Sequence, residues 1–422
     1  MRESVVETIP KQSGGAEVGH RVLFISNGHG EDLLAGVLAE ALHEKCPYVE
    51  SWAFPIVGTG QAYERFPVKV VGTQKEMPSG GWIRQSFAAL REDVKAGFLK
   101  LTWQQWQALK ALRNQVSYVV AVGDIYALYL AYRFVAKPLA FVPTAKSDYI
   151  RSHLAIEKHL MKKYCQIVLA RDELTATNLR HSQIPAQYVG NLMMDAIFPS
   201  GRSLPGIWPG KKVIGILPGS REEAYTNLPL LCITIDEIAT KRPDIVFAVA
   251  LAGNLSLDKT ATILGENGWQ VVHVESPMGG DEGDGTIPKE NNRARWLVKG
   301  KTRLLVAQGR FGDVLDSSSL CLGMAGTANE QAAGLGRPVV AFPGSGSQFT
   351  AKFLRAQKRL LGDALEAARD PWAAGQAVLE ILTDPTKYAV MAACGRERMG
   401  EPGGAKRMAT ELIRLWSIQG NG

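Results

Sequence analysis

The sequence predicts an α/β protein with two doubly wound domains. Apolar runs rich in Val, Ile and Leu alternate with helical patterns from Arg21 onward, which is typical of parallel sheets covered by helices on both faces. A second series of the same kind follows a stretch rich in Pro, Gly and Ser at residues 198–210. The chain of 422 residues is also long for one hydrophobic core. We therefore expect two Rossmann-like domains that face each other.

Candidate strands occur at regular intervals in both series. The first series comprises residues 21–26, 49–54, 68–71, 118–122, 139–142, 166–169 and 187–189. The second comprises residues 212–217, 245–251, 270–274, 303–307, 320–322 and 338–342. The expected organisation is a disordered N-terminus over 1–20, a first domain over 21–197, a linker over 198–210 and a second domain over 211–422.

Two further segments stand out in the second series. Residues 275–301 are rich in Gly and charge, and they are too long for a normal connection between strands, so we expect a mobile surface loop there. Residues 404–417 have the pattern of a final helix.

Composition and charge limit the kinds of partner. The net charge of +7 is modest and suits an anionic substrate or an anionic membrane surface. No basic run or aromatic-basic ladder of a nucleic-acid reader occurs, so nucleic acid is the least favoured partner. The five cysteines are scattered and none forms a C-x-x-C pair, which favours a reducing compartment. The polar first 19 residues do not resemble a signal peptide, and the longest apolar run, 121–135, is too short and polar to span a bilayer. We expect a cytoplasmic protein, at most peripheral to a membrane.

The turn after the first candidate strand carries several polar residues. Gly28 and Gly30 allow a tight turn before a helix that is expected to start at about residues 32–33, and free backbone amides there can meet an anion or a hydroxyl. An ordinary tight turn explains the two glycines equally well, and the incomplete G-x-G-x-x-G pattern makes a nicotinamide dinucleotide a distant alternative. His29 and Glu31 favour a functional role, because polar side chains at the carboxyl end of a parallel strand point into the usual ligand crevice.

Asp124 follows the strand at residues 118–122 directly. A carboxylate at the end of a buried strand costs free energy unless it is paired or used. Asp is also a good N-cap for the helical pattern that follows. Catalysis and capping are equally compatible with this position.

The second half opens with a strand that runs into Gly219, Ser220 and Arg221. A hydroxyl, backbone amides and a guanidinium at a strand's carboxyl end can hold a diphosphate. A surface arginine after a turn is the alternative, and the position at the strand end favours the binding role.

Two more loops of the second half have the same character. Gly326 and Thr327 precede a helix whose first turn carries Glu330. Such a loop can cradle a phosphate, and an acidic residue near it is the usual partner of ribose hydroxyls, although Glu is also favoured in the first helical turn by the helix dipole alone. The glycine-rich loop at 344–348 ends with Gln348. Three such loops in one domain point to a large phosphorylated ligand.

These motifs are the basis of a family resemblance. The chain resembles the lipid-A-disaccharide synthases and a related group of paralogues, which are glycosyltransferases of the GT-B type. The resemblance runs from about residue 21 to 417. Its most specific blocks are residues 190–197 (GNLMMDAI), residues 217–221 (LPGSR), and residues 326–328 (GTA) with Glu330.

The resemblance implies an inverting, metal-independent transfer from a UDP-sugar donor to a lipid or glycolipid acceptor, without a cofactor. UDP would be held by the second domain and the acceptor by the first. Asp124 matches the family's essential aspartate, a candidate base, and Arg221 its essential arginine. The absence of any Asp-x-Asp triplet agrees with a mechanism in which Arg221 and helix dipoles stabilise the leaving diphosphate. The default reaction joins UDP-diacylglucosamine and lipid X to give the lipid A disaccharide and UDP.

The first loop departs from the family. The family pattern is Gly-Glu-x-Ser-Gly-Asp, whereas this chain has Asn27-Gly28-His29-Gly30-Glu31-Asp32. Because that loop faces the acceptor, three alternatives stay open. They are a UDP-sugar 2-epimerase, a synthase of another glycolipid, and a non-catalytic protein that keeps the nucleotide-sugar site.

Residues 81–113 predict contact with the inner-membrane surface. They combine helically spaced apolar residues with Trp82, Trp103, Trp106 and six basic against two acidic residues, a composition typical of an interfacial helix. The alternative is a helix whose apolar face packs on the core.

Overall fold

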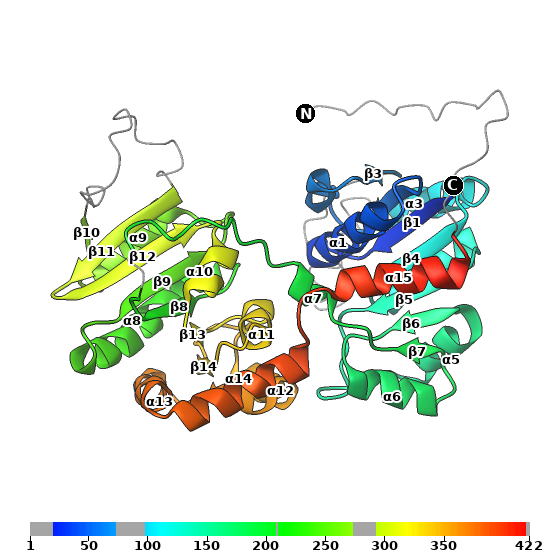
Figure 1. Ribbon diagram of the computed structural model, residues 1–422. Coiled ribbons are helices and arrows are strands. Elements are labelled where there is room, and N and C mark those ends of the chain that lie inside the picture. Colours follow the sequence, from blue (N-terminus) through cyan, green and yellow to red (C-terminus); the bar gives the residue numbers. More distant parts are fainter. Residues whose placement is uncertain (1–19, 73–97, 208–209, 273–292, 419–422) are drawn as a thin grey trace.

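The computed structural model describes residues 20–72, 98–207, 210–272 and 293–418, and these form two α/β domains (Figure 1). Residues 1–19, for which disorder is expected, lie outside the described residues. The first sheet has seven parallel strands in the order β3-β2-β1-β4-β5-β6-β7. The second has eight strands in the order β10-β11-β12-β9-β8-β13-β14-β15. The predicted doubly wound α/β architecture is confirmed.

The strands of the first sheet are β1 (Arg21–Ser26), β2 (Glu50–Pro55), β3 (Lys69–Val70), β4 (Tyr118–Gly123), β5 (Leu139–Pro143), β6 (Ile167–Leu169) and β7 (Ala186–Gln187). Those of the second sheet are β8 (Val213–Leu217), β9 (Val246–Leu251), β10 (Gln270–Val272), β11 (Ala294–Lys299), β12 (Thr302–Gln308), β13 (Leu320–Gly323), β14 (Val339–Ala341) and β15 (Leu365–Ala367). The central strands β8 and β9 are buried along their whole length, and β4 is buried from Val119 onward, as the continuous apolar runs predict.

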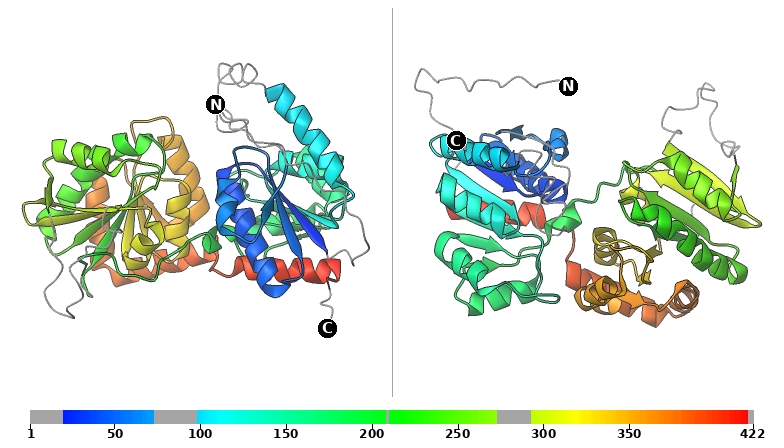
Figure 2. Two further views of the ribbon diagram at one scale, coloured as in Figure 1. Left: turned by 90° about the horizontal axis from the view of Figure 1, so that it is seen from above. Right: turned by 180° about the vertical axis from the view of Figure 1, so that it is seen from behind.

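Helices cover both faces of the first sheet (Figures 1 and 2). One face carries α1 (His29–Lys45), α7 (Leu192–Asp195) and α15 (Gly404–Trp416), whose apolar residues form a single core with that face. The other carries α3 (Phe98–Leu112), α4 (Ile125–Leu130), the short helix η2 (Ala131–Val135), α5 (Ala155–Tyr164) and α6 (Glu173–His181). A one-turn helix, η1 (Gln61–Arg65), packs beside α1.

The helices of the second domain share one large core with its sheet. They are α8 (Glu223–Lys241), α9 (Leu257–Glu266), α10 (Phe311–Ser317), α11 (Thr327–Gly334), α12 (Ala351–Leu361), η4 (Gly362–Ala364), α13 (Pro371–Thr383) and α14 (Pro385–Met399).

The prediction of a surface loop over residues 275–301 is wrong at its C-terminal end. Ala294–Lys299 forms β11, which pairs antiparallel with β12. Trp296 of this strand is buried and its Nε1 donates to the carbonyl oxygen of Pro205, 3.0 Å away. Burial of this indole and of Leu297 stabilises the hairpin in spite of the charged neighbouring sequence. Residues 275–292 lie outside the described residues.

The last helix crosses from the second domain to the first, which differs from the expected assignment of 211–422 to one domain. The Asp195 carboxylate accepts hydrogen bonds from the backbone N–H groups of Gly403 and Ala405 and so fixes the start of α15. At the other end, Trp416 stacks on Tyr118 with ring centroids 4.5 Å apart. The apolar face of α15 thus completes the core of the first domain. The expected boundaries at residues 20, 197 and 210 remain predictions.

Candidate functional site

Both sheets reverse their strand order at one point, and the predicted site residues other than Gln348 lie at or beside these two points. In the first sheet the reversal falls between β1 and β4, and in the second between β8 and β13. Loops that leave neighbouring strands in opposite directions open a crevice at the carboxyl edge, where α/β proteins usually bind ligands. The loops after β1 and β4 therefore lie together, as do those after β8 and β13.

The turn after β1 begins α1 earlier than the sequence predicts. Gly28 has φ 131°, which an L side chain rarely adopts, and the helix starts at His29 rather than near residue 32. His29 and Gly30 are exposed in the first turn. The His29 ring has no hydrogen-bond partner among the described residues. The geometry therefore gives His29 no partner for a catalytic role in this state.

Asp124 is the N-cap of α4 and also faces the turn after β1. Its Oδ1 accepts from the backbone N–H of Tyr126 at 2.9 Å and of Ala127 at 3.4 Å. Its Oδ2 accepts from the Asn27 side-chain amide at 2.9 Å. Asp124 therefore caps α4, and its hydrogen bond with Asn27 connects it to the loop after β1 at the strand reversal.

Glu31 lies beside Asp124 in a space that two glycines leave open. A Cβ atom at Gly123 would stand 3.0 Å from Glu31 Cγ, and one at Gly28 would stand 2.9 Å from Glu31 Oε2. Burial raises the pKa of the Glu31 carboxyl, and the charge of Asp124 raises it further. A carboxyl group with a raised pKa beside a second carboxyl group is a common arrangement in acid–base catalysis.

A buried polar group lies beneath this pair, and the sequence does not reveal it. Ser26 donates from Oγ to Asp32 Oδ1 at 2.6 Å, and the Tyr63 hydroxyl lies 2.6 Å from Ser26 Oγ. Burial is the largest cause that raises the pKa of Asp32, to about 7, and the charge of Glu31 adds to it. Burial likewise raises the pKa of Tyr63 well above its usual value. The first turn of α1 therefore holds two carboxyl groups that gain protons easily.

The loop after β8 presents the cation that the sequence predicts. Gly219 has φ 109° and packs against the carbonyl oxygen of Met324 in the loop after β13, 3.6 Å from its ideal Cβ position. Ser220 is exposed, and its carbonyl oxygen accepts from the Asn254 amide at 3.1 Å. The Arg221 guanidinium is exposed and has no hydrogen-bond or ion-pair partner among the described residues. It is available to an anionic ligand.

Two buried side-chain amides, Asn329 and Gln357, fix the loop after β13, and the sequence does not predict them. Asn329 Nδ2 donates to the carbonyl oxygen of Gly323 at 3.2 Å and to Gln357 Oε1 at 3.0 Å. Gln357 Nε2 donates in turn to the carbonyl oxygens of Ala325 and Gly326. A Cβ at Gly323 would overlap Asn329 Oδ1, so this close approach needs glycine.

The N-terminus of α11 is free to meet an anion. Gly326 is its N-cap and supplies no side-chain hydrogen bond, and Thr327 at the first position is exposed. The first backbone N–H groups of a helix and its dipole attract negative charge. Glu330 in the same first turn pairs with Arg171 of the first domain at 2.8 Å. This ion pair shows that the carboxyl edges of the two sheets face each other.

Gln348 is also exposed, but its loop is fixed by a carboxylate. Glu223, in the first turn of α8, accepts from the backbone N–H of Gln348 at 2.9 Å and of Phe349 at 3.0 Å. The loop after β14 is thereby joined to the helix that follows Arg221. Gly219, Ser220, Arg221, Gly326, Thr327 and Gln348 thus belong to three connected loops at one edge.

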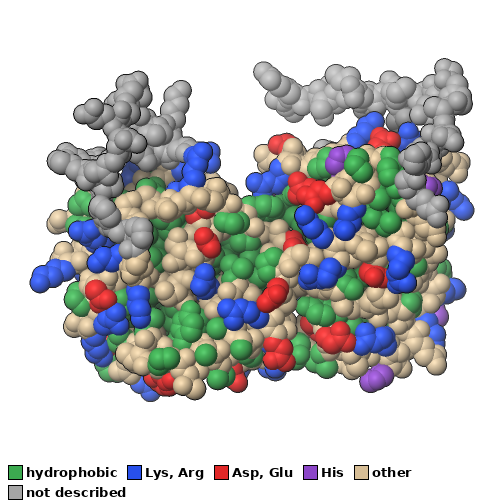
Figure 3. Space-filling view, viewed as in Figure 1, with side chains coloured by type: hydrophobic (Ala, Val, Ile, Leu, Met, Phe, Trp, Pro, Cys, Tyr) green, Lys and Arg blue, Asp and Glu red, His purple; other side chains and the backbone are tan. Residues whose placement is uncertain are grey.

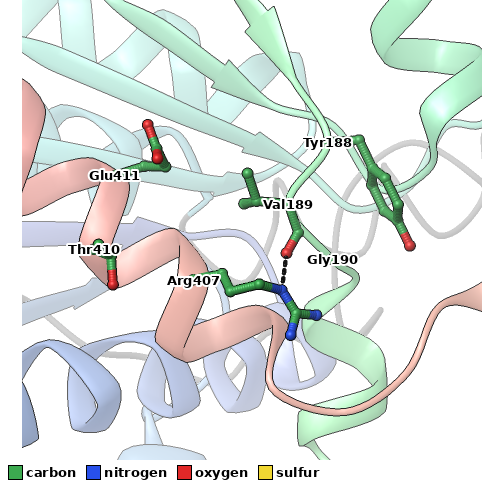
Figure 4. Close-up of a pocket in the computed structure, with 6 residues that line it drawn as sticks. All are labelled: Tyr188, Val189, Gly190, Arg407, Thr410 and Glu411. Atoms are coloured by element: carbon green, nitrogen blue, oxygen red, sulfur yellow. Dashed lines mark hydrogen bonds between the residues drawn. The ribbon is translucent and has the colours of Figure 1, made fainter.

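An open hollow of about 510 Å³ lies elsewhere, between α15 and the segment after β7 (Figure 4). It is lined by Tyr188, Val189, Gly190, Arg407, Thr410 and Glu411. Arg407 Nε donates to the carbonyl oxygen of Val189 at 2.5 Å. No predicted site residue lines it. In the described part of the chain, no cluster of three or more His, Cys, Asp or Glu residues could hold a metal ion.

Comparison with known sequences gives short matches. No protein-family model matches the chain. The lipid-A-disaccharide synthase of Geobacter sulfurreducens is 31% identical over 95 residues, which is 21% of this chain and 25% of that protein. That of an Azoarcus species is 34% identical over 91 residues, which is 20% of this chain and 23% of that protein. The chain matches about a quarter of the length of these relatives.

Comparison with solved structures covers nearly the whole chain. A UDP-GlcNAc 2-epimerase from Neisseria meningitidis bound to UDP-GlcNAc is 15% identical, with a TM-score of 0.58 over 93% of this chain and 99% of that one. The glycosyltransferase SnogD from Streptomyces nogalater is 18% identical, with a TM-score of 0.54 over 94% and 99%. MurG from Acinetobacter baumannii is 13% identical, with a TM-score of 0.53 over 94% and 99%. The two-domain fold is therefore of the GT-B type, which glycosyltransferases and these epimerases share.

Proposed function

We propose that the protein is an inverting glycosyltransferase that moves a sugar from a UDP-sugar donor to a lipid acceptor, in the manner of a lipid-A-disaccharide synthase. The proposal rests on one observation: the carboxyl edges of the two sheets face each other and carry groups of opposite charge. Carboxyl groups line the strand reversal of the first sheet. That of the second sheet is lined by a guanidinium that has no partner among the described residues and by a helix N-terminus without a side-chain cap.

The second domain supplies the donor site in this proposal. Arg221 binds the diphosphate, helped by the N-terminus of α11 at Gly326 and Thr327. Glu330 accepts from the ribose hydroxyls. When the bond between the sugar carbon and the diphosphate oxygen breaks, negative charge grows on that oxygen, and these fixed donors stabilise it.

The first domain supplies the acceptor site and the base. Gly30, which has no atom within 4 Å of an ideal Cβ position, lets the acceptor approach the turn that begins at Gly28, and Asp124 takes the proton of the attacking hydroxyl. The acceptor oxygen bonds to the sugar carbon on the face opposite the departing UDP, which inverts that centre. Glu31 is the second candidate base, because burial raises the pKa of its carboxyl group and so makes its carboxylate a better proton acceptor.

The membrane is the proposed location of the acceptor, and the helical face formed by α3, α4, η2 and α5 is the proposed contact surface. Within these four described helices the only acidic residue is Glu157, which is buried and paired with Lys146. The exposed side chains include Lys110, Arg133, Lys162, Lys163, and Trp103 at 59% exposure. Figure 2, right, views the protein from this side. On the opposite face, cations and carboxylates intermingle (Figure 3).

Part of the predicted interfacial helix is core rather than surface. Leu101, Leu109 and Leu112 of α3 are buried, and Trp106 stacks on Phe134 with ring centroids 5.2 Å apart. Residues 81–97, including Trp82, lie outside the described residues. No helix of the described chain has the length and apolar content to cross a bilayer. Trp103 is therefore the described tryptophan of this segment that the membrane proposal rests on.

A UDP-sugar 2-epimerase is the second candidate, because an epimerase from Neisseria meningitidis shares the fold over 93% of this chain. The two functions are separated by incubating the protein with UDP-GlcNAc and with UDP-2,3-diacylglucosamine, each with and without a membrane lipid extract. A transferase releases UDP and forms a glycolipid, seen by mass spectrometry, only when both donor and lipid are present. A change of configuration at the sugar's second carbon without lipid would instead identify an epimerase, and UDP binding without either product would identify a non-catalytic protein.

A further inference from the structure

Arg171 joins three segments of the chain at the junction of the domains. It follows β6 at the carboxyl edge of the first sheet and is 8% exposed. One terminal nitrogen donates to the carbonyl oxygen of Thr144, after β5, at 3.1 Å. The other donates to Oε2 of Glu330, in the first turn of α11, at 2.8 Å. The two contacts use different nitrogens of one rigid, planar guanidinium, so they fix the direction of the Glu330 contact more firmly than the freely rotating donors of an ammonium would.

This ion pair is only partly solvated. The side chains of Arg171 and Glu330 are 9% and 13% exposed. Removing both charges from water costs free energy that their attraction does not reliably recover, so a buried pair is weak support for a purely stabilising role. Its position at the donor edge suggests a role in binding.

Arg171 occupies only part of the Glu330 carboxylate. Arg171 donates to Oε2, and Oε1 accepts no hydrogen bond among the described residues. A carboxylate has about four lone-pair positions, so one cation on Oε2 leaves Oε1 open to hydroxyl donors. The guanidinium also restricts the rotamer of Glu330 before any ligand arrives, which lowers the entropy lost on binding.

We propose that Arg171 is a positioning residue of the donor site, which holds Glu330 so that the carboxylate accepts from the two ribose hydroxyls of a nucleoside diphosphate. This inference rests on the proposed donor site. It means that the site in the second domain is complete only when the first domain contributes Arg171. Donor binding and the contact between the domains are then linked, and each strengthens the other.

Other contacts hold the domains together when Arg171 is removed. Gln331 Nε2 donates to the carbonyl oxygen of Met193 at 2.8 Å, and the Arg398 guanidinium lies 3.9 Å from the ring centroid of Tyr149. Arg171→Met is therefore expected to remain folded, and Arg398→Met is a matched control that removes a different cation from the same junction.

The test compares calorimetric binding of UDP with that of 2′,3′-dideoxyuridine diphosphate, which lacks both ribose hydroxyls. Hydrogen bonds to a charged group predict that the wild-type protein prefers UDP by roughly tenfold or more. Arg171→Met should lose most of this preference while its affinity for the dideoxy compound stays unchanged. Arg171→Lys should retain an intermediate preference, and Arg398→Met the full one.

A second comparison separates positioning from domain attachment. The exchange variant Arg171→Glu with Glu330→Arg can rebuild the ion pair, so melting temperature should return toward that of the wild type, but the preference for UDP should not. Restoration of the preference by the exchange, or an equal loss for both nucleotides in Arg171→Met, would overturn the inference and leave the donor site standing. Failure of the wild-type protein to bind UDP at all would overturn both.

Discussion

The two strand reversals of this molecule are built from opposite chemistry. Around β1 and β4 the first turn of α1 contributes Glu31 and Asp32, and the N-cap of α4 contributes Asp124; two of these carboxyl groups have raised pKa values. Around β8 and β13 the loops contribute a guanidinium, glycines and the start of a helix. One edge is suited to exchange protons and the other to hold an anion. The same fold thus provides two sites with different tasks, and each task depends on loop residues rather than on the sheets.

The rigidity of the two edges also differs in origin. In the second domain, side-chain amides fix the backbone of the loop after β13, since Asn329 and Gln357 bond its carbonyl oxygens. In the first domain, side chains fix one another, as Asn27 bonds Asp124 and Ser26 bonds Asp32. A fixed backbone preserves an anion site in any protonation state, whereas a fixed set of carboxyl groups responds to pH.

The largest effect is expected from the first edge. Asp124→Asn keeps the size and the capping oxygen but removes the basic group, and general-base catalysis contributes about 10²–10⁴-fold in rate. Turnover should fall by that factor while UDP affinity, measured by calorimetry, is unchanged because the donor loops lie in the other domain. Glu31→Gln is the matched variant. A nearly full rate in Asp124→Asn with a large loss in Glu31→Gln would make Glu31 the base and Asp124 only a cap.

The second effect concerns the buried carboxyl of the first edge. The pKa of Asp32 is about 7 in the folded protein against 3.8 normally, so the folded state binds more protons than the unfolded state between these values. Stability should therefore fall as pH rises from about 4 to 7, by a few kcal/mol, since each pKa unit corresponds to about 1.4 kcal/mol. Asp32→Asn cannot ionise but still accepts from Ser26, and it should lose less stability over this range. Chemical denaturation at several pH values measures this. Parallel curves for the two proteins would contradict the assignment.

The third effect tests the second edge. Arg221→Ala should weaken UDP binding by about 1.5–3 kcal/mol, the usual contribution of a charge-assisted hydrogen bond. Arg242→Ala is the control, because this arginine of the same domain pairs with Asp244 at the surface. Calorimetry should show the loss only in the first variant. If Arg221→Ala changes neither UDP affinity nor turnover, the loops after β8 and β13 are not the anion-binding site.

The sequence predicts the positions of both carboxyl-edge sites well, because the ends of the apolar runs indicate where the strands end. A residue that follows a buried parallel strand within a few positions lies near the carboxyl edge, so Asp124, Arg221 and Gly326 could be placed without coordinates. Side chains that pair across long sequence separations leave no such signal. Tyr63 contacts Ser26 from a one-turn helix, and Arg171 contacts Glu330 across 159 positions.

The same distinction explains the errors at the level of the fold. The helical pattern at 404–417 predicts α15 correctly, yet the pattern does not say which sheet receives its apolar face. That choice depends on Asp195 and Tyr118, more than 200 residues earlier. Likewise β11 has charged residues near both ends and follows a charged stretch, so only its pairing with β12 reveals it as a strand.

The smallest effect asks whether only the first domain contacts a membrane. Trp103 on α3 is 59% exposed, and Trp372 on α13 of the second domain is 52% exposed, so they form a matched pair. Fully burying a large apolar side chain contributes about 1.5–3 kcal/mol. Because each indole is already partly buried in the protein, Trp103→Ser should lower binding to phosphatidylglycerol vesicles by roughly 1 kcal/mol, and Trp372→Ser should not change it. Vesicle flotation at low and high salt measures both, and binding should weaken with salt because the surrounding side chains are cationic. Equal losses in the two variants would place the contact outside the face formed by α3, α4, η2 and α5. A wild-type protein that never floats would make the acceptor soluble and favour the epimerase, with the donor edge unaffected.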